Sequence, residues 1–410
     1  MYTLFGDGIH DDTDAIQEMI DSGCCEVVLP VPKVRYLISR PLELPSNFKL
    51  CLPRFAEIRL VAGSNCVMLK NKMVVDRQNR TEALMFDHAR RDANEARIYD
   101  YIDEYSPDAP CANIEVTGGI WNFNNLEQGP SPILTGIIEP RSYSGFVFLF
   151  YNVRNLRLAD LTLKDPSTFS VTLDKVSYFT VENITFDFNY GNPLAACMDG
   201  IHLVGNCHFG YIRNLKGACY DDLVAINADE GSVGPITNIR VSGIFAEDCH
   251  SAVRFLSCKS RIEKIHISDI YGTYFQYCVG ISKYYQEGQF DGSYDAITID
   301  HVYASKAVRK AVYNKTEDSY VFPIIWIQGG LEIHDLKITD VYRREKITPV
   351  ETIKISKGAR IDTLILDNIS SENETEADEI VMFVNEGEVK NLYLGKIRAD
   401  GRQMKMDELI

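Results

Sequence analysis

Three aspartates near the middle of the chain have the types and spacing for acid–base chemistry. Asp199 lies in one short stretch, and Asp221 and Asp222 lie in another that follows about one sequence repeat later. If each repeat forms one coil of a solenoid, the three carboxylates lie on neighbouring coils. Clustered carboxylates can protonate a leaving group and activate a water molecule, which are the two tasks of glycoside hydrolysis. The spacing therefore indicates a candidate hydrolytic site.

The local geometry around the acidic pair is constrained. Adjacent residues on an ideal strand point to opposite faces of a sheet, so Asp221 and Asp222 can both face outward only near a strand end or a bulge. A carboxylate that pointed into the interior would be costly to bury unless it had a partner. Nearby carboxylates also repel one another, which raises the pKa of at least one of them, as a general acid near neutral pH requires.

A repeated pattern predicts the elements that hold these residues. From about residue 153 an apolar residue, any residue, a turn-prone polar residue and an apolar residue recur in that order. The third positions of the pattern are Asp160, Asn183, Asn214, Gly243, Asp269, His301, Asp340, Asn368 and Lys396. Alternating apolar residues precede them, which is a strand signal. Asn and Asp suit a fixed turn because they tolerate the left-handed conformation. The pattern predicts an all-β fold, a parallel β-helix.

The whole chain, residues 1–410, is expected to form a single β-helix domain. Regular coils are predicted for residues 153–400, and a loop insertion is predicted at about 73–110, where the repeat is broken. Residues 1–25 are predicted to form an N-terminal cap that contains a short helix. Ala15, Ile16, Met19 and Ile20 give this helix one apolar face, and an Asp or Thr before it can cap its free amides. Such a helix would cover the open end of a solenoid.

Composition excludes several other classes of protein. The formal net charge of −16 argues against non-specific binding of nucleic acid, which needs a basic face. No run of about eighteen apolar residues occurs, so no membrane span is expected. The first residues lack the basic and apolar regions of a signal peptide, which predicts a cytoplasmic protein, or a secreted one if a leader has been removed. The oligomeric state is left open.

The spacing of the cysteines predicts that they pack in the interior and do not form a metal site. Eleven cysteines include no Cys-x-x-Cys pair, so the zinc-ribbon and thioredoxin patterns are absent. Cys219, Cys249 and Cys278 lie about one repeat apart and are expected to stack as reduced thiols in the interior. The predicted hydrolysis needs no metal and no organic cofactor.

Two groups of motifs resemble known families. Gly6-Asp7-Gly8, followed by residues 11–17, resembles the opening of pectin-degrading right-handed β-helix proteins, a superfamily of hydrolases, lyases and phage tailspikes. Residues 198–201 resemble the Asn-Thr-Asp-Gly-Ile motif of the polygalacturonase family, glycoside hydrolase family 28. Residues 221–226 resemble its Gly-Asp-Asp-x-x-Ala-Ile motif, and residues 252–255 resemble the start of its Arg-Ile-Lys motif. These specific motifs cover only about residues 197–257.

The resemblance implies a right-handed β-helix and a role for each matched residue. Asp221 would be the general acid that protonates the glycosidic oxygen. Asp199 and Asp222 would hold and activate the attacking water, with inversion at the sugar. Arg254 would bind the substrate, often through a carboxylate. The partner would be a pectin-type or related plant oligo- or polysaccharide, one that could contain uronate.

The chain also departs from the family pattern. The Gly-His-Gly motif is missing, and residues 229–235 run directly into the next strand instead, as if about one coil had been deleted. The family's lysine two residues after the arginine is Leu256, and the Asn of the first motif is Cys197. These groups help to bind an acidic sugar, so their loss leaves the identity of the sugar open.

Other residues could replace the missing binding groups. His202 follows Asp199 by three positions, and His250 precedes Arg254 by four, so either could supply the histidine. Lys283 lies about one coil after Arg254 and could supply the cation, while its neighbour Tyr284 could stack on a sugar ring. Each of these residues could instead have a purely structural role.

Two alternatives to a hydrolase share the predicted fold. A polysaccharide lyase would use a base and Arg254, with calcium bound by the aspartates. A non-catalytic, carbohydrate-binding or tailspike-like solenoid would need no chemistry at all. Trp121 and Trp326 are the only tryptophans; either could be a sugar platform, although packing against the coil is the commoner use of Trp.

Overall fold

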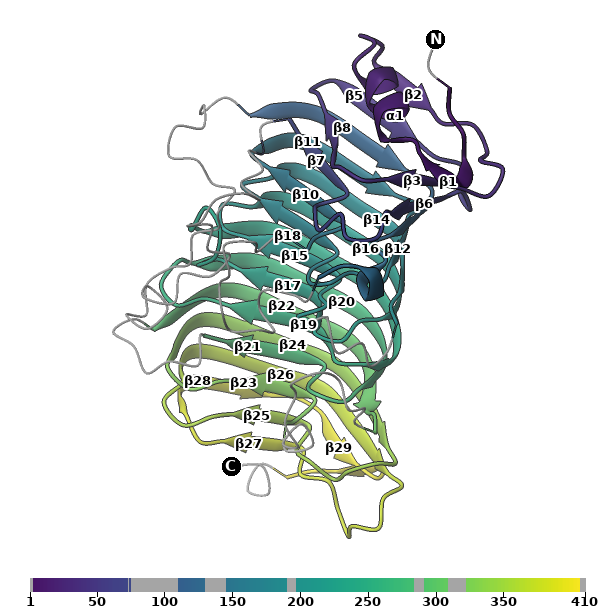
Figure 1. The fold of residues 1–410 in the computed structure, drawn as a ribbon. Coiled ribbons are helices and arrows are strands. Elements are labelled where there is room, and N and C mark those ends of the chain that lie inside the picture. Colours follow the sequence, from purple (N-terminus) through teal and green to yellow (C-terminus); the bar gives the residue numbers. More distant parts are fainter. Residues whose placement is uncertain are drawn as a thin grey trace.

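The computed structural model describes residues 3–72, 74, 110–129, 145–189, 197–283, 291–308 and 322–405. In these ranges parallel strands follow one another as the successive coils of a right-handed β-helix (Figure 1). The chain runs from the N-terminal coils to the C-terminal coils without reversing direction along the axis (Figure 1). The predicted fold class is confirmed.

One sheet of the solenoid has eleven strands and holds the three aspartates. Its order is β27-β25-β23-β21-β19-β17-β15-β13-β10-β7-β4, so each coil contributes one strand beside the strand of the next coil. The strands are β4 (Leu42–Leu44), β7 (Leu69–Asn71), β10 (Phe148–Tyr151), β13 (Val171–Asp174), β15 (Ile201–Val204), β17 (Asp222–Asn227), β19 (Ser251–Leu256), β21 (Val279–Ser282), β23 (Ile325–Ile327), β25 (Ile353–Ile355) and β27 (Phe383–Asn385).

The second sheet has nineteen strands and forms the other sides of the coils. Its short early strands are β1 (Asp7–Asp11), β2 (Glu26–Val28), β3 (Arg35–Ile38), β5 (Phe48–Cys51), β6 (Glu57–Leu60), β8 (Cys111–Thr117), β9 (Ile120–Asn122), β11 (Val153–Ala159) and β12 (Thr162–Lys164). Its later strands are β14 (Ser177–Asp187), β16 (His208–Ala218), β18 (Ile236–Cys249), β20 (Ile262–Tyr274), β22 (Gly292–Lys306), β24 (Leu331–Glu345), β26 (Arg360–Asn373), β28 (Glu388–Leu394), β29 (Ile397–Ala399) and β30 (Arg402–Gln403). A 3-10 turn, η1 (Asn125–Glu127), follows β9.

From Asn183 to Asn368 the repeated turn residue lies within the long strands of this sheet, and Asp160 directly follows β11. Eight of its nine predicted positions have a φ between 51° and 74°, in the left-handed region; they are Asp160, Asn183, Asn214, Gly243, Asp269, His301, Asp340 and Asn368. Asn214 Nδ2 donates to Asn183 Oδ1 at 3.1 Å, and Asn183 Nδ2 donates to Asp160 Oδ1 at 3.1 Å. A ladder of side-chain amides therefore links the same turn on successive coils. Lys396 is the exception, and the chain there is split into β28 and β29.

Strand register decides which residues face the core. Val171, Ile201, Val224 and Val253 pair in one row across neighbouring coils, and all four are fully buried. The next row, which contains His202, Ala225 and Arg254, points to the outer face of the eleven-stranded sheet because side chains alternate along a strand. The candidate site is therefore built on the outside of the coils, on a close-packed interior.

The N-terminal helix α1 (Thr13–Ile20) packs Ile16 and Ile20 into the first coils, as the apolar face predicts. The expected capping differs in detail. Asp12 occupies the N-cap position, but its carboxylate accepts hydrogen bonds from the backbone amides of Phe5 and Gly6 instead of a helix amide. The preceding segment supplies these donors, and Asp11 Oδ1 accepts from the Thr13 amide at 2.9 Å.

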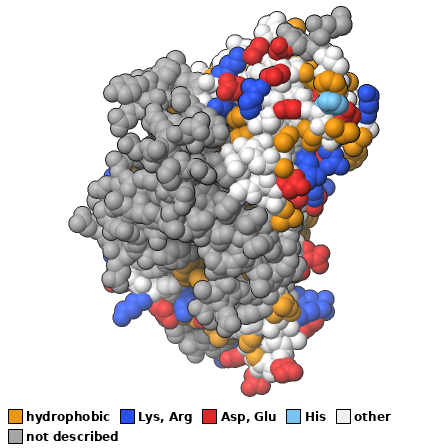
Figure 2. Space-filling model, viewed as in Figure 1, with side chains coloured by type: hydrophobic (Ala, Val, Ile, Leu, Met, Phe, Trp, Pro, Cys, Tyr) orange, Lys and Arg blue, Asp and Glu red, His pale blue; other side chains and the backbone are white. Residues whose placement is uncertain are grey.

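The surface at this end is mixed in character. Lys, Arg, Asp and Glu alternate there with exposed apolar side chains at the upper right of Figure 2. The most exposed apolar residues among those described in this region are Ile9, Val28, Val31, Val34 and Phe55.

Interior cysteines and Trp121 follow the structural expectation. Cys219, Cys249 and Cys278 are fully buried, and the Sγ atoms of Cys219 and Cys249 lie 3.5 Å apart. All eleven cysteines are unbridged. Trp121 is fully buried, with its ring edge-on to Phe148 at 4.8 Å. Trp121 is therefore a core residue and is not accessible as a platform for a sugar ring.

Within the described part of the chain, no helix combines the length and the apolar character needed to cross a bilayer. The loop insertion expected at about 73–110 lies outside the described residues, apart from residues 74 and 110.

The amide ladder gives a stability test. Replacing Asn214 by Ala places a Cβ-bearing, non-bonding residue in the left-handed region and should cost about 1–2 kcal/mol. Replacing it by Gly loses only the side-chain bond and should cost less, since Gly243 occupies the same position on the next coil. Urea-unfolding midpoints of the two variants measure the difference. An Ala variant as stable as the Gly variant would contradict the role of backbone strain.

Candidate functional site

The three aspartates meet where two neighbouring strands begin. Asp221 directly precedes β17, Asp222 is its first residue, and Asp199 lies two residues before β15. The backbone amide of Asp222 donates to Asp199 Oδ1 at 3.2 Å. The strand end lets the two adjacent aspartates leave the strict alternation of a strand. The parallel pairing of β15 with β17 thus brings residues from successive coils into contact.

His202 links Asp199 to an acidic residue on the next coil. His202 Nδ1 lies 2.6 Å from Asp199 Oδ2, and Nε2 lies 2.8 Å from Glu230 Oε2. Asn227 Nδ2 donates to the same Glu230 oxygen at 3.2 Å. The imidazole ring stacks on Phe169, with centroids 3.8 Å apart. The imidazole is held between two carboxylates and has little freedom to turn.

Glu230 was not among the residues expected from the sequence. It lies in the segment that replaces the Gly-His-Gly motif, 28 residues after His202, which is about one coil. That spacing was the available signal: an acidic residue one coil from a histidine lies within reach of it in a parallel solenoid. Asn227, at the end of β17, is a second contributor that the motifs did not indicate.

Burial and charge shift the proton equilibria of this network. Burial raises the pKa of Asp199 to about 8, the charges of Asp221 and Asp222 add to this effect, and the contact with His202 opposes it. Burial alone would lower the pKa of His202, but its hydrogen bonds to Asp199 and Glu230 outweigh burial and raise that pKa to about 9. The network therefore retains protons at neutral pH that isolated side chains would release.

Asp222 is held by groups from the following coil. Ser251 Oγ donates to Asp222 Oδ1, and Arg254 Nη1 lies 3.7 Å from Asp222 Oδ2. Both residues lie on β19, which pairs in register with β17. Arg254 Nε also donates to Ser282 Oγ at 3.1 Å, so the guanidinium is oriented from two coils.

His250 approaches Asp221 from the coil that bears Arg254. His250 Nδ1 lies 3.6 Å from Asp221 Oδ1 and 3.3 Å from Ser251 Oγ, and its ring is edge-on to Phe275. One ligand atom each of Asp221, Asp222 and His250 lies within 4.8 Å of the others. These three could hold a divalent cation, although the Arg254 guanidinium beside Asp222 already supplies positive charge there.

Exposure separates the acidic side chains. The Asp221 side chain keeps 10% of its accessible surface and that of Arg254 keeps 14%, against 4% each for Asp199 and Asp222. Asp221 and Arg254 are thus the best placed to touch a bound molecule, whereas Asp199 and Asp222 lie deeper.

Other expected site residues lie elsewhere. Lys283 follows β21 at the opposite end of the strand from the aspartates, and its Nζ lies 3.8 Å from Asp291. Tyr284 lies outside the described residues. Trp326, on β23, stacks on Tyr277 with ring centroids 5.6 Å apart, and its Nε1 donates to Ser356 Oγ. The sheet thus brings His202, His250 and Arg254 to the aspartates and separates Lys283 from them.

Comparison with known proteins identifies the class of fold. No protein-family model and no curated protein sequence matches the chain. Among solved structures, the family 28 exopolygalacturonase of Yersinia enterocolitica is 13% identical, with a TM-score of 0.53 over 95% of this chain and 76% of that one. A tailspike protein of E. coli bacteriophage HK620 is 11% identical, with a TM-score of 0.62 over 93% of this chain and 61% of that one. The mannuronan C-5 epimerase AlgE6 A-module of Azotobacter vinelandii is 12% identical, with a TM-score of 0.53 over 95% of this chain and 97% of that one.

These similarities show that the chain has the parallel β-helix fold. At such low identity they show the fold alone. Since that fold is shared by enzymes and by tailspikes, the chemistry has to be argued from the site.

The raised pKa of Asp199 predicts a pH-dependent stability. The folded protein binds this proton more tightly than the unfolded chain, so the stability that it contributes is lost as pH rises from about 3.8 towards 8. An Asn in its place stays neutral. The free energy of unfolding of Asp199→Asn, relative to that of the wild type, should therefore increase by up to about 1.4 kcal/mol for each pH unit between pH 4 and 6.

Urea unfolding at several pH values measures this difference. The chosen window lies below the ordinary pKa of histidine, so the rise in the pKa of His202 does not contribute to it. A constant difference between variant and wild type across the window would contradict the assigned shift.

Proposed function

We propose that this protein is an inverting glycoside hydrolase of the family 28 type that acts on uronate-containing, pectin-type oligo- or polysaccharides. The observation that supports this most is the convergence of Asp199, Asp221 and Asp222 beside Arg254 on the outer face of one sheet. Two separate carboxyl functions, an acid and a base, are what inverting hydrolysis requires.

We base the proposed roles of the three carboxyls on their exposure. Asp221 is the most exposed and donates its proton to the glycosidic oxygen as the C–O bond breaks. Asp199 and Asp222 orient a water molecule, and one of them takes its proton as the water oxygen bonds to the anomeric carbon. Asp199 can do so only when it is ionised, which with a pKa of about 8 is its minor form at neutral pH. The water attacks the face opposite the leaving group, so the configuration inverts. His202 adjusts the basicity of Asp199, and Ser251 orients Asp222.

Arg254 suits the recognition of a uronate. Its guanidinium is partly exposed and is oriented by Ser282 and Asp222. A planar guanidinium matches a carboxylate better than an ammonium group does, because it can donate two parallel hydrogen bonds. With Leu256 at the family's lysine position and fully buried, Arg254 carries the recognition of negative charge in this row.

Removal of the proposed acid gives the direct test. Asp221→Asn should lower the release of reducing ends from oligogalacturonides about 100- to 10,000-fold, the usual contribution of a general acid. Asp269→Asn is the matched control, because Asp269 lies at the repeated left-handed turn where other coils carry Asn. Asp221→Asn turnover equal to that of the control would exclude the assignment.

The histidine network predicts a shift in the pH–rate profile. The His202 contact lowers the pKa of Asp199, which must be ionised to accept a proton. His202→Asn should therefore move the acidic limb of the profile to higher pH, by about 1–3 units for the loss of a close opposite charge. His266→Asn, on the nineteen-stranded sheet, is the control and should leave the limb in place. A shift to lower pH in the His202 variant would contradict the mechanism.

The grouping of Asp221, Asp222 and His250 supports one second candidate, a lyase that uses a divalent cation. A lyase would release unsaturated products that absorb ultraviolet light and would lose activity in chelator. Hydrolysis yields saturated products and continues in chelator. Binding of oligogalacturonides without either product would indicate a tailspike-like carbohydrate-binding protein.

A further inference from the structure

A row of aromatic rings runs along the outside of the nineteen-stranded sheet. Phe245, Tyr271, Tyr303 and Tyr342 occupy the same register position on β18, β20, β22 and β24. Successive ring centroids lie 5.0, 4.7 and 5.0 Å apart, and the planes differ by 10° or less. Each coil therefore adds one ring to a continuous stack.

The stack is interrupted at the next coil. Ser370 on β26 pairs with Tyr342, and Arg398 on β29 pairs with Ser370. A hydroxymethyl group thus stands where a fifth ring would lie. Because each coil occupies roughly 4.8 Å, the backbones at Tyr342 and Arg398 are about two coils apart, and only the small side chain of Ser370 lies between them in this row.

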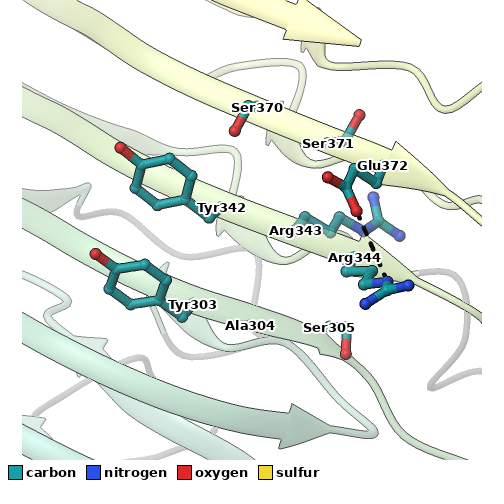
Figure 3. A pocket seen from close by; sticks show the side chains of 9 residues that line it. All are labelled: Tyr303, Ala304, Ser305, Tyr342, Arg343, Arg344, Ser370, Ser371 and Glu372. Atoms are coloured by element: carbon teal, nitrogen blue, oxygen red, sulfur yellow. Dashed lines mark ion pairs between the residues drawn. The ribbon is translucent and has the colours of Figure 1, made fainter. Parts of the chain in front are cut away.

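A cavity of about 300 Å³ lies beside the end of the stack, lined by residues of β22, β24 and β26 that include Tyr303, Tyr342 and Ser370. Figure 3 shows the parallel rings of Tyr303 and Tyr342 along one side, with the hydroxyls of Ser370 and Ser371 on the next strand. This volume is at the lower end of the range for small-molecule sites, which suits a single ring rather than a large ligand.

The polar rim of the cavity carries little free charge. Arg344 Nε lies 3.7 Å from Glu372 Oε2 and also contacts Glu374 (Figure 3). The other arginine of the lining, Arg343, is fully buried, and its Nη2 lies 2.8 Å from Glu345. The rim therefore offers donors and acceptors for hydroxyl groups but no uncompensated cation for a carboxylate.

From these features we infer that the interruption of the aromatic stack is a second carbohydrate site, which binds one uncharged pyranose ring. The apolar face of the sugar lies on the ring of Tyr342, in the place of the missing fifth aromatic. Its hydroxyls contact Ser370 and the Arg344–Glu372 pair. An aromatic platform with a few placed polar groups is the usual composition of such a site.

This site lies on a different sheet from the aspartates, so it binds sugar without cleaving it. It would hold a neutral part of a polysaccharide while another part reaches the acidic cluster. The inference does not depend on hydrolysis, and the two can fail independently.

Two substitutions test the site from opposite directions. Ser370→Tyr supplies the fifth ring and fills the space, as the preceding coils do. Tyr342→Leu removes the platform but keeps an apolar residue on the strand. Phe245→Leu is the matched control, because it removes a ring at the far end of the stack from the cavity.

Neutral tetrasaccharides of glucose, mannose, galactose and xylose serve as probes for the full-length protein, with calorimetry and saturation-transfer NMR as readouts. At least one probe should bind, and both test variants should weaken it tenfold or more while Phe245→Leu leaves the affinity unchanged. Hydrolysis of oligogalacturonides, measured on the same samples, should be the same in all of them. Binding of no neutral probe, or equal binding by Ser370→Tyr and the wild type, would overturn the inference. Near-ultraviolet circular dichroism of each variant verifies that it is folded.

Discussion

Parallel pairing of one coil on the next is the constraint on which the rest of the structure depends. In the eleven-stranded sheet Ile201 pairs with Val224, and Val224 pairs with Val253, so the interior rows stay in register over successive coils. A slip of one residue would turn every outward side chain into the core. The same register that packs the interior therefore holds Asp199, Asp222 and Ser251 against one another on the outside.

The acidic cluster places ionisable groups where little solvent can stabilise their charges. Asp199, His202 and Glu230 are each almost fully buried, although they lie on the outer face of the sheet. Burying ionisable groups is costly unless they are paired, and replacing such groups with apolar residues often stabilises a protein. A stack of coils can tolerate the cost, because each coil is held by its neighbours through whole rows of interior side chains. The raised pKa values of Asp199 and His202 result from this burial and from the hydrogen bonds within the cluster.

The two outer faces of the solenoid use the repeat in different ways. On the nineteen-stranded sheet similar residues recur on several successive coils, which produces the ladder of side chains at Asp160, Asn183 and Asn214 and the stack of aromatic rings. On the eleven-stranded sheet the outward residue changes with every coil: His202, Ala225, Arg254 and Gly280 follow one another in a single row. In this sheet the repeat sets only the distance between outward side chains on neighbouring coils. A site forms there because side chains of different chemical types lie at that distance from one another.

Much of the architecture could be predicted because its signals are local. The left-handed turns could be predicted from Asn, Asp and Gly, since the left-handed backbone conformation itself favours these residues. The alternation of side chains allowed Asp221 and Asp222 to face outward together at a strand end or at a bulge, and the structure has them at the start of β17. The sequence could not show which aspartate caps the helix, because the carboxylate of Asp12 accepts hydrogen bonds from the backbone amides of Phe5 and Gly6 instead.

The contacts between coils were less predictable. Glu230 was missed because its partner His202 lies one coil earlier and no motif links the two. Lys283 was expected beside Arg254 on repeat counting alone, but counting does not say at which end of a strand a residue lies.

The sequence by itself determined the coil, its turn residues and the interior thiols, because each depends on the period of the chain and on the conformational preferences of single residues. Only the tertiary structure decided which carboxylate is paired, which is exposed, and where the aromatic stack ends in a cavity. Those properties depend on side chains from different coils, and their distances are fixed by strand register and by burial, neither of which a single repeat contains.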